Sequence, residues 1–146
     1  MITGYGHLAV RVEDMEKSVD FYTRVLGFRK AFELSNPATG APSIVYIHVN
    51  ANAFLELFHG GTDKTEWTPK TVGFSHVCLE CDDIEAVLRQ VEAASWPVDV
   101  PLKRGRDLNL QAWIADPDGN RIELMQLDPE SPHRKIIAGE SVSRLP

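Results

Sequence analysis

The sequence predicts an α+β fold made of two βαβββ modules, and three observations lead to this prediction. An internal repeat relates Gly6–Gly27 to the segment that begins at Ser75, with His7 matching His76. Each copy opens with an alternating apolar pattern and then changes to a helical period. Three further apolar stretches follow each helical segment. One module is too small to cover both faces of its own sheet, so we expect the copies to pair within the chain or between chains.

The first copy begins with a strand, because HLAVRV alternates with period two and places His7 and Arg11 on the same face. Asp14 is positioned to cap the following helix, and Gly27 supplies a left-handed stop. The apolar stripe expected on that helix is Met15, Val19, Tyr22 and Leu26. The three strands after it are expected at about Arg29–Leu34, Ile44–Asn50 and Ala53–Phe58.

The second copy repeats this order. Asp82 with Glu85 forms a capping-box pattern before the helix, and Pro97 prevents the helix from continuing. Asp116–Gly119 has strong turn chemistry, so the last two strands should form a tight hairpin. The apolar stripe of the helix is Ile84, Leu88 and Val91. The strands are expected at about Val98–Lys103, Leu110–Ala115 and Arg121–Gln126.

We expect a single domain over residues 1–128, composed of the repeats 4–58 and 73–128, followed by a C-terminal tail over 129–146. The net charge of −6 without a basic stripe argues against nucleic acid or an anionic membrane as a partner. No secretory signal and no long apolar run are present, which predicts a cytoplasmic protein that acts on a small molecule. Cys78 and Cys81 form a C-x-x-C that we interpret as strand residues, because no second cysteine pair completes a zinc site.

Four ionisable residues occupy matching places in the two copies. His7 and His76 lie at the start of the first strand of each copy, and Glu56 and Glu123 lie within the last strand. A lone charge among apolar neighbours is unfavourable unless something compensates it. Each of these residues alone is best explained as an ordinary strand residue. The joint pattern instead favours a metal centre, since independent accidents would not repeat both residue types in both copies.

Two imidazoles and two carboxylates suit an octahedral divalent ion, with two coordination positions left for water or substrate oxygens. The carboxylates neutralise the charge of the ion, and imidazole is a good ligand for nickel, zinc or iron. We therefore predict that His7, Glu56, His76 and Glu123 bind one divalent metal ion. Ni²⁺ or Zn²⁺ is expected ahead of Fe²⁺ or Mn²⁺. His48, His59 and His133 are interpreted as lying outside this site.

Two strings, HLAVRVEDMEKSVDFYTRVLGF and ADPDGNRIELMQ, resemble the vicinal oxygen chelate superfamily, and in particular glyoxalase I, the lactoylglutathione lyases. The resemblance covers residues 6–126. It implies mixed sheets curved around a metal cleft, a homodimer, and isomerisation of the hemithioacetal of methylglyoxal and glutathione to a thioester. All four predicted ligands match the metal ligands of glyoxalase I by motif. By the same resemblance Glu123 is the principal catalytic base, with Glu56 on the opposite side of the substrate.

The resemblance also suggests residues that hold the thiol. Arg11 matches an arginine that glyoxalase I uses for the carboxylates of glutathione. The loop 103–107 is locally basic, so Lys103 and Arg106 are candidates to bind a substrate anion, although the loop is also typical of a solvated turn. Gly60 stands where the family often has a glutathione-binding Asn, which argues against glutathione itself.

Three other members of the superfamily remain as alternatives. An iron extradiol dioxygenase would need only His7, His76 and Glu123, and Glu56 is the residue that disfavours it. An epimerase of the methylmalonyl-CoA type resembles the pattern but has an amide where Glu56 stands. A non-catalytic antibiotic-binding protein usually lacks the ligand set.

Overall fold

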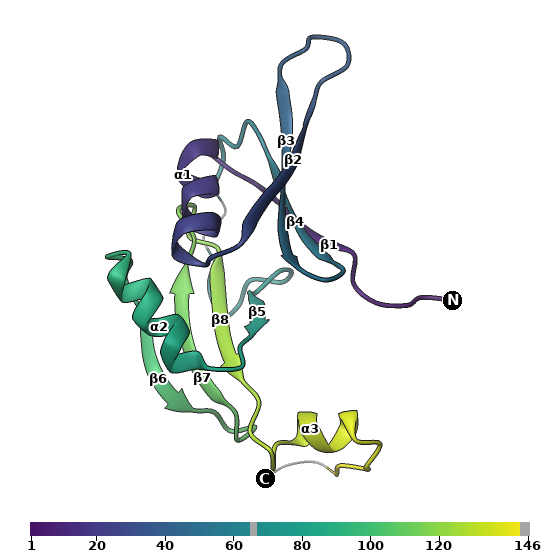
Figure 1. Cartoon of the computed structure of the whole chain (residues 1–146), viewed down its shortest axis with the longest axis vertical. Coiled ribbons are helices and arrows are strands. Elements are labelled where there is room, and N and C mark those ends of the chain that lie inside the picture. The colour runs from purple at the N-terminus through teal and green to yellow at the C-terminus, as the bar shows by residue number, and fades with distance from the viewer. Residues whose placement is uncertain (65–66, 144–146) are drawn as a thin grey trace. The chain divides into compact units, whose positions relative to one another are not determined.

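A computed structural model describes residues 1–64 and 67–143, and the chain divides into two compact units, Met1–Thr68 and Pro69–Pro146 (Figure 1). Each unit contains one four-stranded mixed sheet and the helices that follow its first strand. The predicted α+β fold of two βαβββ modules is therefore confirmed. No helix in the part of the chain that the structure describes is long and apolar enough to cross a membrane.

Unit 1 contains one module, with its strands in the order β1-β4-β3-β2. The first and last strands of the module pair in parallel, and the other neighbours are antiparallel. The parallel pair places the start of the module beside its end, which brings His7 near Glu56. The elements are β1 (His7–Arg11), α1 (Met15–Asp20), η1 (Phe21–Val25), β2 (Arg29–Ser35), β3 (Pro42–Asn50) and β4 (Ala53–Phe58).

The helix of unit 1 begins and ends where predicted. The Asp14 side chain accepts a hydrogen bond from the Lys17 backbone N–H at 3.1 Å, and Gly27 has a φ of 73°. The predicted apolar stripe is partly wrong, because the helix widens into the π-helical turn η1 and the Leu26 N–H bonds back to the carbonyl of Phe21. The wider turn rotates the following side chains away from a 3.6-residue period. The buried positions are Ser18, Phe21, Tyr22 and Val25, whereas Met15, Val19 and Leu26 are only half-buried.

Unit 2 repeats this topology, with the strand order β5-β8-β7-β6 and a parallel β5–β8 pair. The predicted cap of its helix is wrong by one residue. The Asp83 side chain accepts from the Ala86 N–H, while the Asp82 carboxylate accepts from the Asp83 N–H. Its elements are β5 (Val77–Glu80), α2 (Ile84–Ala93), β6 (Val100–Arg104), β7 (Leu110–Ala115), β8 (Arg121–Gln126) and α3 (Pro132–Ile137).

The predicted hairpin between β7 and β8 is confirmed. The Asp116 carboxylate accepts from the backbone N–H groups of Asp118 and Asn120, and Gly119 has the positive φ of 85° that this turn requires. Beyond β8 the tail contains the short helix α3, which Ser131 caps by accepting from the Arg134 N–H. The tail is thus partly helical.

Alternation along the strands separates two faces in each sheet. The core face of unit 1 carries the buried residues Val45, Ile47, Leu55 and Leu57, and that of unit 2 carries Ala112, Ile114, Ile122 and Leu124. The opposite face is called the outer face below. It carries Glu56 in unit 1 and Glu123 in unit 2, because each glutamate lies between two core-facing residues of its strand.

Candidate metal centre

The outer face of unit 1 brings His7 and Glu56 together. In the parallel β1–β4 pair, Ala9 lies opposite Glu56, and His7 is two residues earlier on the same face. The His7 Nδ1 atom lies 3.4 Å from Glu56 Oε1. The carboxylate is buried, with 11% of its side chain exposed, while 53% of the imidazole side chain is exposed. A buried acceptor therefore lies beside an imidazole that solvent or a ligand can reach.

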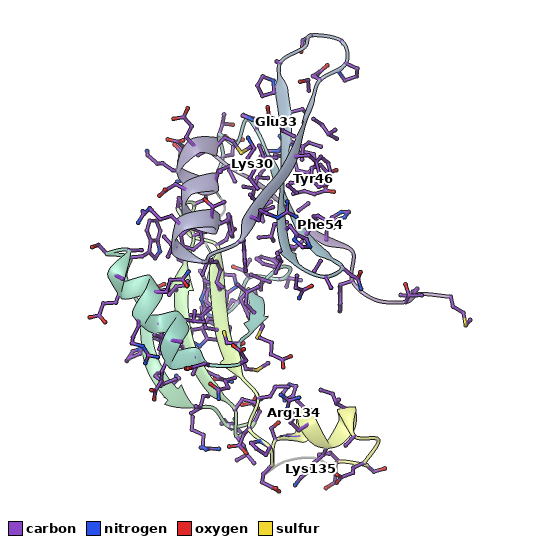
Figure 2. The ribbon with its side chains drawn as sticks, viewed as in Figure 1. Lys30, Glu33, Tyr46, Phe54, Arg134 and Lys135 are labelled. Atoms are coloured by element: carbon purple, nitrogen blue, oxygen red, sulfur yellow. The ribbon has the colours of Figure 1, made fainter. Side chains whose placement is uncertain are left out.

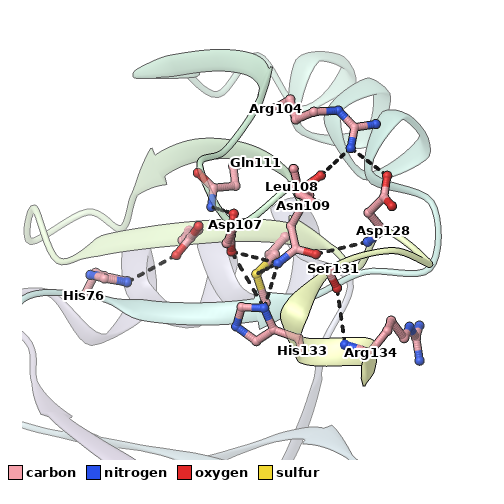
Figure 3. Close-up of polar contacts among 12 residues, drawn as sticks. His76, Arg104, Asp107, Leu108, Asn109, Gln111, Asp128, Ser131, His133 and Arg134 are labelled. Carbon is pink, nitrogen blue, oxygen red and sulfur yellow. Dashed lines mark hydrogen bonds and ion pairs between the residues drawn. The ribbon is translucent and has the colours of Figure 1, made fainter. Parts of the chain in front are cut away.

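The outer face of unit 2 holds the matching pair. Cys78 lies opposite Glu123 in the parallel β5–β8 pair. His76, labelled in Figure 3, immediately precedes β5. The His76 Nε2 atom lies 3.2 Å from Glu123 Oε2, and the exposed fractions of the two side chains are 32% and 10%. The His76 Nδ1 atom lies 3.2 Å from the hydroxyl of Ser75. The repeat therefore produces the same contact twice, with the imidazole turned to present a different nitrogen.

Tyr46 contacts the carboxylate of the first pair, His7 with Glu56. It lies directly opposite Glu56 across the β3–β4 ladder, and its hydrogen bond to the Glu56 carboxylate, with burial, raises the pKa of the phenol. Its ring stacks on Phe32 at a centroid distance of 4.2 Å. Tyr46 and Phe54 are both labelled in Figure 2, on neighbouring strands of this sheet. The Glu56 carboxylate is thus held by a donor that stays protonated at neutral pH.

Trp113 and Cys78 lie on either side of Glu123, in the second pair, His76 with Glu123. Trp113 lies opposite Glu123 across the β7–β8 ladder and contacts the His76 ring edge-on at 4.8 Å. The guanidinium carbon of Arg121 lies 4.6 Å from the centre of the Trp113 ring. Burial, followed by the charge of Glu123, raises the pKa of the Cys78 thiol to about 12. Cys78 is therefore a protonated thiol beside Glu123 at neutral pH.

These neighbours could have been found from strand register. Strand aromatics are core residues more often than not, so the sequence alone gives Tyr46 and Trp113 no role at the site, and it gives Cys78 only a place in a strand. Each lies directly opposite a predicted glutamate on the neighbouring strand. The missing signal was the pairing register, which the repeat alone does not supply. Cys81 lies just beyond β5, and both cysteines are free thiols.

The chemistry of each pair fits a divalent ion. Two ligands that bind one ion at about 2.1 Å and at right angles are about 3.0 Å apart, close to the nitrogen–oxygen distances of 3.4 and 3.2 Å. An ordinary hydrogen bond spans a similar distance, so the support comes from the donor types and their repetition. Among residues 1–64 and 67–143, no three His, Cys, Asp or Glu side chains are gathered in one place as a set of metal ligands. Each pair by itself would supply two of the ligands of an octahedral ion.

The predicted substrate-binding residues lie in different settings. Arg11 shares the outer face with His7 and donates from Nη1 to the His59 carbonyl at 2.6 Å, while its guanidinium lies 5.5 Å from the centre of the Phe58 ring. Lys103 lies near the end of β6, and Arg106 lies in the loop that follows it. Both side chains are exposed. The three positions remain predictions as substrate contacts.

The three histidines interpreted as outside the site have local partners. His48 Nδ1 lies 3.5 Å from Arg29 Nη2, and its ring contacts Phe54 at 5.1 Å. His59 contributes its carbonyl to Arg11. His133, in α3, lies 3.0 Å from the side-chain nitrogen of Asn109.

Comparison with known proteins places this geometry in context. A model of the glyoxalase/bleomycin resistance protein/dioxygenase superfamily matches residues 4–124. A lactoylglutathione lyase from Pseudomonas putida is 32% identical over 156 residues, covering 86% of each chain. A glyoxalase family protein from Enterococcus faecalis has a TM-score of 0.72 at 21% identity, covering 84% of this chain and 96% of that one. An antibiotic-binding protein from Streptomyces sp. CB03234 has a TM-score of 0.63 at 28% identity, covering 87% and 98%.

Proposed function

The chain belongs to the glyoxalase/bleomycin resistance protein/dioxygenase superfamily, and from that premise we propose that it is a metal-dependent isomerase of the glyoxalase I type. Its substrate would be the hemithioacetal formed by a 2-oxoaldehyde such as methylglyoxal and a thiol. Its product would be a 2-hydroxyacyl thioester. The observation that carries this proposal is the pair of equivalent contacts, His7 with Glu56 and His76 with Glu123.

These four side chains would hold one Ni²⁺ or Zn²⁺ ion, and the protein would act as a homodimer. When bound, the ion would stabilise the negative charge that develops on the two neighbouring oxygens of the substrate. The donor set of two imidazoles and two carboxylates suits such an ion. We also propose a cytoplasmic location, which agrees with the free thiols of Cys78 and Cys81. Residues 1–128 would act as one domain with 129–146 as its tail.

The protein's own part in the reaction is to move a proton from one carbon to the next, while the hydroxyl proton of the hemithioacetal passes to the neighbouring oxygen. A carboxylate oxygen of Glu123 would take the proton from the carbon that bears sulfur, and the resulting carboxylic acid would return it to the neighbouring carbon. The substrate is isomerised without an external oxidant or reductant, because the same proton leaves one carbon and arrives at the next. Glu56, held by Tyr46, would face the other side of the substrate. Low exposure of both carboxylates favours this role, since water competes little for the proton.

Recognition of the thiol is assigned to basic residues. Arg11 would bind a carboxylate of the thiol, since it lies on the outer face with His7 and a guanidinium can hold a carboxylate through two hydrogen bonds. Lys103 and Arg106 would bind a further anion of the substrate. Each of these contacts is expected to affect KM more than kcat.

A second candidate is a non-catalytic binding protein. It is supported by the 28% identity to the antibiotic-binding protein from Streptomyces, a value below the 32% identity to the Pseudomonas putida lactoylglutathione lyase. The aromatic side chains of Phe32, Tyr46 and Trp113 on the outer faces would suit an aromatic ligand.

Two measurements on the purified protein decide between these functions. Metal analysis should find stoichiometric nickel or zinc, and absence of bound metal after exposure to both would support the binding protein. Thioester absorbance should then rise when the loaded protein receives methylglyoxal with glutathione or another thiol. A protein that holds nickel or zinc but forms no thioester with any thiol is not a glyoxalase I, and an epimerase or an iron dioxygenase becomes the better assignment.

A further inference from the structure

The loop between β6 and β7 aims an acidic side chain at the outer face of unit 2. The loop closes through the Gly105 N–H bond to the Asn109 carbonyl at 2.7 Å, and Leu108 has a positive φ of 72°. A Cβ atom on Gly105 would lie 2.5 Å from both Asp107 Oδ1 and Gln111 Nε2. A side chain at 105 would therefore displace the Asp107 carboxylate and the Gln111 amide from these positions.

Both carboxylate oxygens of Asp107 are held by amide donors. Gln111 Nε2 donates to Oδ1 at 3.1 Å, and the fully buried Asn109 donates from Nδ2 to Oδ2 at 2.7 Å. The Nδ1 atom of His133 lies 3.8 Å from Oδ2 (Figure 3). The Asp107 side chain keeps 26% of its surface exposed and that of His133 keeps 47%. The carboxylate is thus fixed in direction and still open to a ligand.

Strand register places this carboxylate beside the candidate metal centre. Gln111 is two residues before Trp113 on β7, so both side chains lie on the same face, and Trp113 is the residue opposite Glu123. Two residues of a strand span about 7 Å. Asp107, which is bound to Gln111, therefore lies on the outer face near the His76–Glu123 pair, about two strand residues further along β7.

We propose that Asp107, with His133 beside it, is a specificity subsite for a cationic group on the thiol of the substrate. The inference rests on the proposed function of this site. A fixed carboxylate accepts from an ammonium or hydroxyl group and repels a carboxylate. Of the basic residues near this loop, Arg104 is bound to the Leu108 carbonyl and the Asp128 carboxylate, while Lys103 and Arg106 are exposed. The loop thus directs a fixed carboxylate at the outer face, in addition to the exposed basic residues Lys103 and Arg106.

The tail contributes to the subsite. Asn109 Oδ1 accepts from the Asp128 N–H at 3.0 Å, and Asn109 Nδ2 lies 3.0 Å from His133 Nδ1. One buried side chain therefore fixes Asp107 and holds α3 against the loop. His133, interpreted from the sequence as lying outside the site, becomes a positioning residue for this carboxylate.

The kinetic test uses three thiols of similar size that differ in charge: N,N-dimethylcysteamine, mercaptoethanol and thioglycolate. Each is combined with methylglyoxal, and kcat/KM for thioester formation is measured for the metal-loaded protein and for Asp107→Asn. Asp107→Asn should lower kcat/KM for the cationic thiol about fivefold more than for the other two. His133→Gln should shift the preference in the same direction. Glu92→Gln removes one negative charge at an exposed position of α2 and should leave the preference among the three thiols unchanged.

A binding test separates this proposal from the proposed function. The unreactive S-methyl ethers of the same three thiols are titrated while the side-chain amide signals of Asn109 and Gln111 are followed by NMR. We expect the cationic ether to shift these signals at lower concentration than the other two, and Asp107→Asn to remove the difference. That result supports the subsite even if no thioester forms. Equal responses to the three ethers, or a charge preference that Asp107→Asn leaves intact, would overturn it.

Discussion

The Nε2 atom of His76 lies 3.2 Å from Oε2 of Glu123, although the first residue precedes the edge strand β5 and the second lies in the neighbouring strand β8. The parallel β5–β8 pair creates this contact, because it sets the start of the module beside its end. Unit 1 repeats it between His7 and Glu56. Because the same strand pairing produces the contact in both modules, the role of each contact can be tested by substitutions in one module at a time.

Replacing either histidine should remove most metal affinity. His7→Ala and His76→Ala each delete a neutral nitrogen donor, and the loss should exceed the roughly hundredfold that outer-sphere changes cause. Metal content after dialysis and competition with a chelator measure the effect. His48→Ala is the matched control, since His48 contacts Arg29 and Phe54 on the same sheet as His7. Full nickel or zinc content in both His7 and His76 variants would contradict the proposed ligand set.

The two glutamates should differ in their kinetic effect. Glu123→Gln removes the proposed base, so we expect kcat to fall by about 10²-fold to 10⁴-fold in protein that still carries metal. Glu56→Gln should lower kcat less, because its carboxylate is already held by Tyr46. Rates are compared per bound ion, which separates loss of the base from loss of the metal. A larger loss of kcat per ion in Glu56→Gln would reverse the assignment of the principal base.

The Cys78 thiol should react slowly with alkylating reagents. Burial and the nearby Glu123 carboxylate raise its pKa from about 9 to about 12, so little thiolate exists at pH 8.5. In a Cys81→Ser background, iodoacetamide should label Cys78 more than about a hundredfold more slowly than it labels free cysteine. The rate should rise with pH up to about 12 and should increase in Glu123→Gln. Labelling as fast as that of free cysteine would show that the thiol is not perturbed.

The raised pKa of Cys78 also gives the sign of an alkaline effect on stability. The folded chain binds this proton more tightly than the unfolded chain, so its contribution is present below about pH 9 and decreases as the pH rises towards 12.

Asn109 should stabilise both the β6–β7 loop and the tail. Asn109→Ala removes the hydrogen bonds of a fully buried side chain to Asp107 and to the Asp128 N–H, and should lower the free energy of unfolding by about 2–3 kcal/mol. Hydrogen exchange should become faster over residues 128–137. Asn52→Ala, in the exposed β3–β4 turn, should change stability by less than about 0.5 kcal/mol. Unchanged exchange in α3 would mean that the tail is held by other contacts.

Arg11 should affect binding of a thiol that carries carboxylates. For the methylglyoxal–glutathione hemithioacetal, Arg11→Gln should raise KM about tenfold and leave kcat nearly unchanged, because the contact is made equally in the ground and transition states. Steady-state kinetics with glutathione and with mercaptoethanol give the comparison. Arg24→Gln, whose guanidinium pairs with Asp20 on the helix surface, is the control. The same change of KM for both thiols would argue against a carboxylate contact.

The repeat in the sequence was sufficient to predict the modules, because strand and helix periods are local properties of the chain. The Asp14 cap, the Gly27 stop and the Asp116–Gly119 hairpin followed from local turn chemistry. The sequence predicts Asp82 as the cap of α2, whereas Asp83 is the cap in the structure, because two adjacent aspartates give the same local signal. The buried stripe of the first helix was partly missed because no local pattern predicts a π-helical turn.

The sequence by itself determined which residues belong to the candidate centre, because duplication repeats His and Glu at matching positions. Only the tertiary structure decided their neighbours, because strand pairing is a long-range property: Tyr46 opposite Glu56, and Cys78 and Trp113 on either side of Glu123. Only it showed that Asp107 and His133, from a loop and the tail, meet near the same face. Hydrogen bonds to one buried residue, Asn109, bring these distant segments together, and no local pattern in the chain encodes that contact.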